Sequence, residues 1–134
     1  MAKKRSSKPD AVEALARQVA DLAFDHKAQN IVVIDVRERS GYADFLVIAT
    51  GTSDRHVQAV AEGVRDGLNG ATGRHPIGVE GLREGQWALV DYGPVVLHVF
   101  HPFTREVYKL EDLWKDAPRL TVEAVSAPKS RRRS

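Results

Sequence analysis

The chain has no cysteine, a single methionine and few aromatic residues, which make up 7% of its 134 positions. The absence of cysteine excludes disulfides, thiolate catalysis and every zinc or iron–sulfur site that depends on cysteine ligands. No apolar run approaches the ~18 residues of a membrane span, and the segment MAKKRSSKPD lacks the hydrophobic stretch of a secretory signal. We therefore expect a cytoplasmic protein that makes no contact with a membrane.

Charge is distributed unevenly along the sequence. Of the 20 Lys and Arg residues, eight lie within residues 1–8 and 129–134, which contain no acid. The remaining 12 cations and 18 acids give residues 9–128 a formal charge of −6, although the whole chain carries +2. Proteins that read nucleic acids directly present a basic face, so the body of this chain is a poor candidate for that class. The basic ends are either disordered, solubilising tails or segments that hold the chain loosely near a polyanion.

Hydrophobic periodicity divides the chain into alternating helices and strands. Apolar residues at helical spacing predict one helix over 10–27 and a second from about residue 54 to Asn69-Gly70, where we expect it to stop. Short helical pieces are expected at 103–108 and 110–114. Runs of β-branched and other apolar residues predict five strands, at 31–36, 45–49, 76–80, 86–92 and 94–101.

These elements predict an α/β fold with a mixed five-stranded sheet flanked by helices. In the segment 86–92, Trp87 and Leu89 point to one face of the sheet, while Ala88, Val90 and Tyr92 point to the other. Since both faces are apolar, both need cover, and the two long helices need not supply all of it. Either the C-terminal helical pieces close the second face, or part of it is left for a partner protein.

The domain boundaries follow the same pattern. We assign residues 10–118 to one folded domain, residues 1–9 to a basic disordered tail, and residues 119–134 to a C-terminal tail that is basic at its end.

Residue patterns that would support catalysis or metal binding are hard to find. Gly51-Thr52-Ser53 joins a strand to a helix, where backbone N–H groups can bind phosphate, but an ordinary helix cap is the commoner use of such residues. A nucleotidyltransferase needs paired carboxylates for its two metal ions, and no such pair follows this turn, because Asp91 is alone on its strand. His98 and His101 point to opposite faces and cannot share a metal ion. We expect no catalytic residue, no metal and no cofactor.

Several segments, taken in order, resemble one protein family. They are IVVIDV at 31–36, ADFLVIATGTS at 43–53, GVEG at 78–81, WALVDYG at 87–93, VVLHVF at 95–100 and LEDLW at 110–114. Together they resemble the ribosomal silencing factors, also called iojap-like proteins, over residues 10–118.

This resemblance implies a nucleotidyltransferase-like fold without catalytic carboxylates, in a protein that is not an enzyme. It implies a translational repressor that binds the large ribosomal subunit through large-subunit protein fourteen and sterically blocks association with the small subunit. It also implies a homodimer, and weak contact of the basic tails with ribosomal RNA. The alternatives are a nucleotidyltransferase-type enzyme that uses Gly51-Thr52-Ser53, and an assembly factor of the large subunit.

The same resemblance places a partner-binding surface on the fourth and fifth predicted strands. From the sequence alone Trp87 fits the core equally well, and the resemblance decides for the interface. The acidic side chains of Glu80 and Asp91 suit a basic partner. Pro94 stands where the family commonly has aspartate, and we leave it out of the site. The predicted contact residues are Trp87, Leu89, Asp91, Tyr92, Gly93 and His98.

Overall fold

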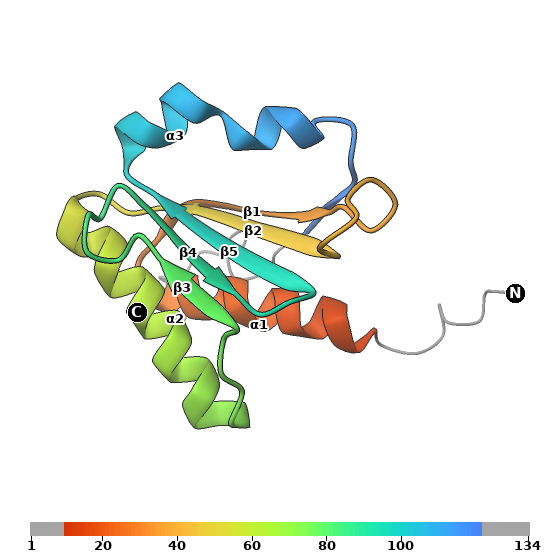
Figure 1. Ribbon diagram of the computed structural model, residues 1–134, viewed down its shortest axis with the longest axis horizontal. Coiled ribbons are helices and arrows are strands. Elements are labelled where there is room, and N and C mark those ends of the chain that lie inside the picture. The colour runs from red at the N-terminus through yellow and green to blue at the C-terminus, as the bar shows by residue number, and fades with distance from the viewer. Residues whose placement is uncertain (1–9, 122–134) are drawn as a thin grey trace, which may run out of the picture.

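The computed structural model describes residues 10–121, and these form one α/β domain (Figure 1). Six strands make a single mixed sheet in the order β3-β4-β5-β2-β1-β6. Strands β2 and β5 are parallel, and the other neighbouring pairs are antiparallel. The elements are α1 (Ala11–Asp25), β1 (Gln29–Asp35), β2 (Phe45–Thr50), α2 (Asp54–Thr72), β3 (Gly78–Glu80), β4 (Trp87–Asp91), β5 (Val95–Phe100), α3 (Pro102–Tyr108), the 3₁₀ helix η2 (Leu110–Trp114) and β6 (Arg119–Leu120).

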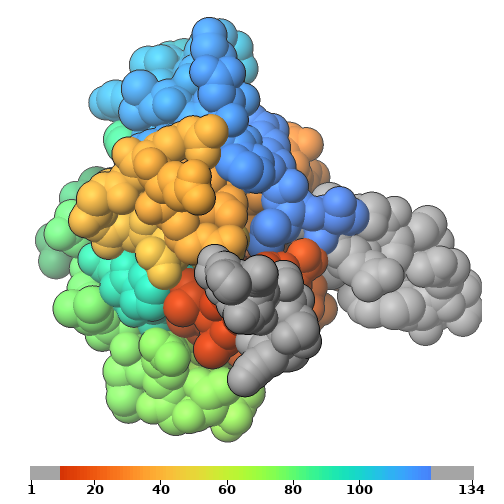
Figure 2. Space-filling model, turned by 90° about the vertical axis from the view of Figure 1, so that its right-hand side faces the viewer, coloured from red at the N-terminus to blue at the C-terminus, as the bar shows by residue number. Residues whose placement is uncertain are grey.

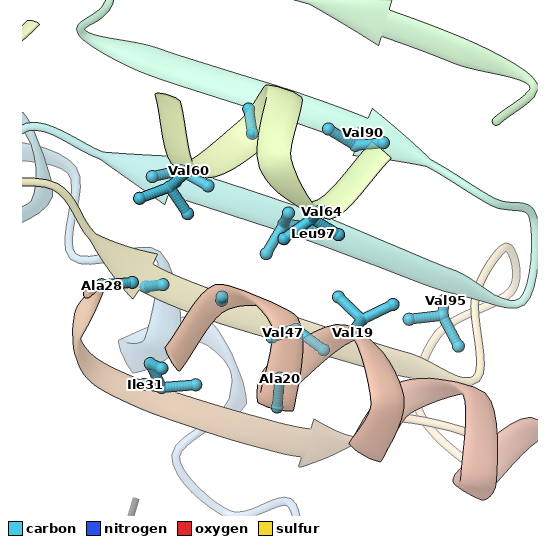
Figure 3. Close-up of a cluster of buried hydrophobic side chains, with 14 of the residues drawn as sticks. Val19, Ala20, Ala28, Ile31, Val47, Val60, Val64, Val90, Val95 and Leu97 are labelled. Atoms are coloured by element: carbon cyan, nitrogen blue, oxygen red, sulfur yellow. The ribbon is translucent and has the colours of Figure 1, made fainter. Parts of the chain in front are cut away.

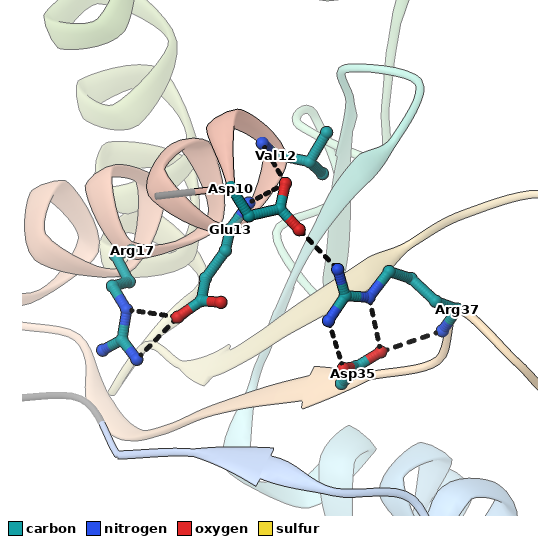
Figure 4. Close-up of polar contacts among 6 residues, drawn as sticks. All are labelled: Asp10, Val12, Glu13, Arg17, Asp35 and Arg37. Carbon is teal, nitrogen blue, oxygen red and sulfur yellow. Dashed lines mark hydrogen bonds and ion pairs between the residues drawn. The ribbon is translucent and has the colours of Figure 1, made fainter. Parts of the chain in front are cut away.

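The first helix begins at a capping residue that also pairs with an arginine just beyond the end of β1. The Asp10 carboxylate accepts a hydrogen bond from the backbone N–H of Val12 at 2.9 Å, which satisfies one of the free donors of the first turn. Its second oxygen pairs with Arg37, which also forms an ion pair with Asp35 at 2.7 Å (Figure 4). The side-chain hydrogen bond from Arg37 lowers the pKa of Asp35. These contacts fix where α1 starts relative to the sheet.

Helices α1 and α2 cover one face of the sheet and form the larger core with it (Figure 3). Val19 on α1 and Val64 on α2 are fully buried against Val47 and Leu97, which lie on the two parallel central strands. Both helices present an apolar stripe at helical spacing, so each buries one side and leaves polar residues in water. The apolar stripes read from the sequence are the ones that form this core.

The opposite face is covered by the C-terminal segment, which lies above the sheet in Figure 1. Leu110 and Trp114 of η2 pack on a second cluster that contains Ile48 and Phe100. In Figure 2 this segment (blue) forms the top of the molecule and α2 (green) the bottom, with the β1–β2 connection (orange) between them. The sequence left open whether the C-terminal helical pieces or a partner protein covers this face. The helical pieces do return to the sheet and cover most of it.

A partly buried arginine holds α3 and η2 in place. Arg105 donates to the Thr50 hydroxyl and to the Asn30 carbonyl, both at 2.7 Å, and forms an ion pair with Glu111 at 2.8 Å. Burial opposes ionisation of Glu111, but the hydrogen bonds and charge of Arg105 outweigh it and lower the pKa of this carboxyl. One side chain thus links α3, η2 and the ends of two strands.

Several element ends differ from the sequence-based prediction by one or two residues, and two differences have a clear physical reason. The sheet has six strands and not five, because Arg119–Leu120 forms β6 and pairs with Val33 and Ile34 of β1. A strand of two residues is too short to show an alternating pattern, and it lies just beyond residue 118, where we ended the domain. Helix α2 continues past Gly70 to Thr72 and is capped by Gly73. A glycine in an exposed helical turn costs only about 1 kcal/mol, which does not stop a helix already packed on the sheet.

Of the tails predicted at residues 1–9 and 119–134, residues 1–9 and 122–134 lie outside the described residues, while Arg119–Leu120 forms β6. Between residues 10 and 121, no helix is both long enough and apolar enough to cross a membrane.

Candidate protein-binding surface

Strand β4 carries three half-buried side chains on the face that α3 and η2 cover. Trp87, Leu89 and Asp91 alternate with the fully buried Ala88 and Val90, which join the core under α1 and α2. This alternation confirms the predicted split of the strand between the two faces. We call Trp87, Leu89 and Asp91 the β4 strip. Because the C-terminal segment covers it only in part, the strip combines a fixed backbone with accessible side chains.

Trp87 is held against three other rings. Its ring centroid lies 4.7 Å from that of Phe100, directly opposite on β5, and 4.9 Å from that of Tyr108 on α3. The indole Nε1–H donates to Nδ1 of His98 at 3.0 Å. Tyr108 itself is 60% exposed, so the aromatic group continues from the sheet onto the surface of α3. Trp87 is thus neither a core residue nor a free surface side chain.

His98 lies beside the strip, on the neighbouring strand β5, and is buried. It is 6% exposed and pairs with Leu89 across the β4–β5 ladder. Burial lowers the pKa of His98 to about 4, and the charge of Asp91 opposes this only in part, so the ring is neutral near pH 7. That His98 contacts a partner stays a prediction; in the structure its ring holds Trp87 through a hydrogen bond from the neighbouring strand.

One carboxylate, Asp91, is part of the strip, and a second, Glu80, lies beside it. Glu80 is exposed on β3 and pairs directly with Leu89, so both side chains point to the same face. One Asp91 oxygen accepts a hydrogen bond from the Gly93 backbone N–H at 2.8 Å. The surface therefore has an apolar centre at Trp87 and Leu89 with acidic groups beside it.

The remaining two predicted contact residues, Tyr92 and Gly93, lie where β4 turns into β5, and the structure gives them different positions. Gly93 has a φ of 93°, which favours glycine over every other residue, and it completes the turn next to Asp91. Tyr92 lies on the opposite face, 3% exposed in the core under α1 and α2, where burial raises the pKa of its hydroxyl. The prediction that Tyr92 contacts a partner does not fit this burial, because the alternation along β4 turns its ring away from the strip.

The Gly51-Thr52-Ser53 turn functions as a helix cap. The Ser53 hydroxyl accepts a hydrogen bond from the His56 backbone N–H at 3.1 Å, and the His56 ring accepts one from the Thr52 backbone N–H at 2.8 Å. A Cβ at Gly51 would lie 2.8 Å from the Val57 nitrogen, so close packing on α2 accounts for this glycine. In residues 10–121, no group of three or more His, Asp or Glu side chains could hold a metal ion.

Sequence reasoning did not place Tyr108 on this surface. The residue ends a short helix, and only the packing of α3 over the end of β5 brings its ring to Trp87. Periodicity in a helix of seven residues gives no reliable face, so the sequence holds little signal for this contact.

The chain is similar to proteins of one family along most of its length. The family model described as "Ribosomal silencing factor during starvation" matches residues 9–134. "Ribosomal silencing factor RsfS" of Bacillus subtilis is 43% identical over 106 residues, which cover 79% of this chain and 89% of that protein. "Mitochondrial assembly of ribosomal large subunit protein 1" of mouse is 35% identical, over 72% of this chain and 43% of the mouse protein.

Solved structures give the same result for the fold. A crystal structure of a protein from Chromobacterium violaceum has a TM-score of 0.75 and 30% identity, with 87% of this chain and 97% of that one covered. A crystal structure of a Bacillus halodurans protein has a TM-score of 0.70 and 32% identity, with 81% and 98% covered. The ordered segments, the α/β fold and these matches agree, and the chain belongs to the ribosomal silencing factor family.

Proposed function

We propose that this protein represses translation by binding the large ribosomal subunit, through large-subunit protein fourteen, and sterically blocking association with the small subunit. The observation that carries the proposal is the β4 strip, a half-buried apolar surface with acidic neighbours in a domain of the ribosomal silencing factor family. Steric blockade needs adhesion and no chemistry, so we propose that the protein is not an enzyme and acts in the cytoplasm.

The strip has the composition of a binding site. A standard protein interface buries about 800 Å² on each partner, and a few central aromatic residues supply most of its affinity. Trp87 occupies that central position here, with Leu89 beside it and Tyr108 extending the apolar area. Truncation of such an anchor costs about 2 kcal/mol or more.

The charge of the domain favours a basic partner. Residues 9–128 carry a formal charge of −6, Asp91 is part of the strip, and Glu80 lies beside it. Such complementarity steers encounter and orientation more than it adds affinity, so high salt should slow association more than it speeds dissociation. A homodimer, and contact of the basic tails with ribosomal RNA, stay predictions of the family resemblance.

Subunit joining tests the proposal. Purified large and small subunits are mixed with increasing amounts of the protein and separated on sucrose gradients. The wild-type chain should suppress joined ribosomes, and Trp87→Ala should require about 30-fold more protein for the same effect, corresponding to about 2 kcal/mol. Phe24→Ala is the matched control, because Phe24 is half-buried on α1, on the other side of the sheet. Undiminished joining at saturating wild-type protein would refute the proposal.

An assembly role for the large subunit is the second candidate, favoured by the name of the mouse relative. Both functions use the same surface, so the variants above do not separate them. The state of the bound particle does: an assembly factor co-purifies with precursor subunits, whereas a repressor co-purifies with mature ones.

A further inference from the structure

The proposed function alone does not explain why a histidine occupies the buried position 98. The ring is nearly fully buried, yet it lies in a layer otherwise filled by apolar side chains such as Val96, Ile48 and Phe100. A leucine or phenylalanine would fill this space without a polar atom. Buried polar groups lower stability unless they are hydrogen-bonded, so the presence of an imidazole here needs a reason.

The hydrogen bonds of the ring supply the reason. Nδ1 accepts the indole N–H of Trp87, so the neutral ring carries its own proton on Nε2. That Nε2–H is buried and has no hydrogen-bond partner among the described residues. The molecule therefore keeps one unsatisfied donor in order to provide an acceptor for Trp87, an arrangement that weakens the fold and benefits only the tryptophan.

The hydrogen bond to His98 fixes the orientation of the Trp87 indole, which the contacts with the neighbouring rings leave less defined. Phe100 and Tyr108 contact the indole at centroid distances of 4.7 and 4.9 Å. The ring planes are tilted against the indole, and such contacts alone do not select one side-chain rotation of Trp87. The hydrogen bond to His98 is directional and fixes which edge of the indole points into the protein. A side chain already held in its bound orientation loses less entropy on binding.

We propose that His98 is a positioning residue, which holds the Trp87 indole edge-inward so that Trp87 offers a partner only its carbon surface. This inference rests on the proposed function. The one polar atom of the Trp87 side chain, Nε1, already donates its hydrogen bond to His98 inside the domain. The partner group that packs on Trp87 is therefore not a hydrogen-bond acceptor. With Asp91 in the strip and Glu80 beside it, the group that fits is the stem and charged head of a lysine or arginine, which packs on an indole face.

Two substitutions at His98 separate positioning from packing. His98→Leu keeps the volume and removes both the acceptor and the unsatisfied donor, so the two losses offset and the thermal midpoint should move little. His98→Asn places an amide oxygen near the position of Nδ1 and should restore the hydrogen bond. We expect large-subunit binding about tenfold weaker for His98→Leu and within about threefold of wild type for His98→Asn, the first figure reflecting a lost hydrogen bond and a freed indole.

The indole resonances give a readout that does not depend on ribosomes. In ¹H–¹⁵N spectra, the Trp87 Nε1–H should be downfield and slow to exchange in the wild type and in His98→Asn, and should shift and exchange faster in His98→Leu. Trp114→Phe identifies the other indole signal. An unchanged Trp87 resonance in His98→Leu would overturn the inference, as would a changed resonance with unaltered binding. If the wild type fails to bind large subunits, the proposed function is wrong, while the spectra still decide whether His98 positions Trp87.

Discussion

Replacing His98 with asparagine should flatten the dependence of stability on pH between about 6.5 and 4. Burial lowers the pKa of His98 from its usual 6.5 to about 4 in the folded protein, so the unfolded chain binds a proton more readily than the folded one. The contribution of neutral His98 to stability is therefore fully present above its pKa in the unfolded chain. It is lost as the pH falls toward its pKa in the folded protein.

The magnitude follows from the width of this window. Each pH unit between the two pKa values changes the free energy of unfolding by about 1.4 kcal/mol. His98 should thus cost the wild type about 2 kcal/mol between pH 8 and pH 5. The lowered pKa values of Asp35 and Glu111 cost stability as the pH falls below their ordinary values of 3.8 and 4.5, so most of their effect lies below pH 5, where this comparison ends.

Urea unfolding followed by far-UV circular dichroism at pH 8, 6 and 5 measures the effect. The difference between wild type and His98→Asn should grow by about 2 kcal/mol in favour of the variant as the pH falls. His75→Asn is the matched control, since His75 is exposed in the connection between α2 and β3, and its curve should follow the wild type. Parallel curves for wild type and His98→Asn would refute the assignment of His98 as a buried neutral ring.

Two further substitutions test the packing around the surface. Arg105→Met should lower the free energy of unfolding by about 3 kcal/mol, because it leaves Glu111 charged and partly buried without its partner. Urea titration measures this change, and a loss below about 0.5 kcal/mol would contradict the prediction. Tyr92→Phe removes a buried hydroxyl that has no partner among the described residues, so stability should stay the same or rise by up to about 1 kcal/mol. Its large-subunit binding should equal that of the wild type, and weaker binding at unchanged stability would return Tyr92 to the interface.

The larger elements of the fold could be predicted because their patterns are long. The helix stripes of α1 and α2 and the alternation along β4 each involve several residues, so burial leaves a readable period. The two-residue β6 leaves no period, and its pairing with β1 depends on where the chain returns after η2. The end of α2 lies at Thr72, beyond Gly70, because Gly73 adopts the left-handed conformation and donates its backbone N–H to the Asn69 carbonyl.

The candidate site was predictable in position but not in detail. The ordered segments and the two-faced apolar β4 pointed to Trp87, Leu89 and Asp91, and these three share one face. Tyr92 entered the predicted site through the family resemblance, although the alternation along β4 turns its side chain to the opposite face, where it is buried. The support of Trp87 by His98 and Tyr108 depends on cross-strand register and on α3 packing, which no local pattern records.

Equilibrium binding to purified large subunits tests the central claim most directly. A fluorescently labelled chain is titrated with large subunits, with small subunits as a specificity control, and compared with Trp87→Ala and Phe24→Ala. We predict saturable binding to large subunits alone, about 30-fold weaker for Trp87→Ala and unchanged for Phe24→Ala. Wild-type binding that Trp87→Ala leaves intact, or equal binding to both subunits, would contradict an account in which the β4 strip is the docking surface.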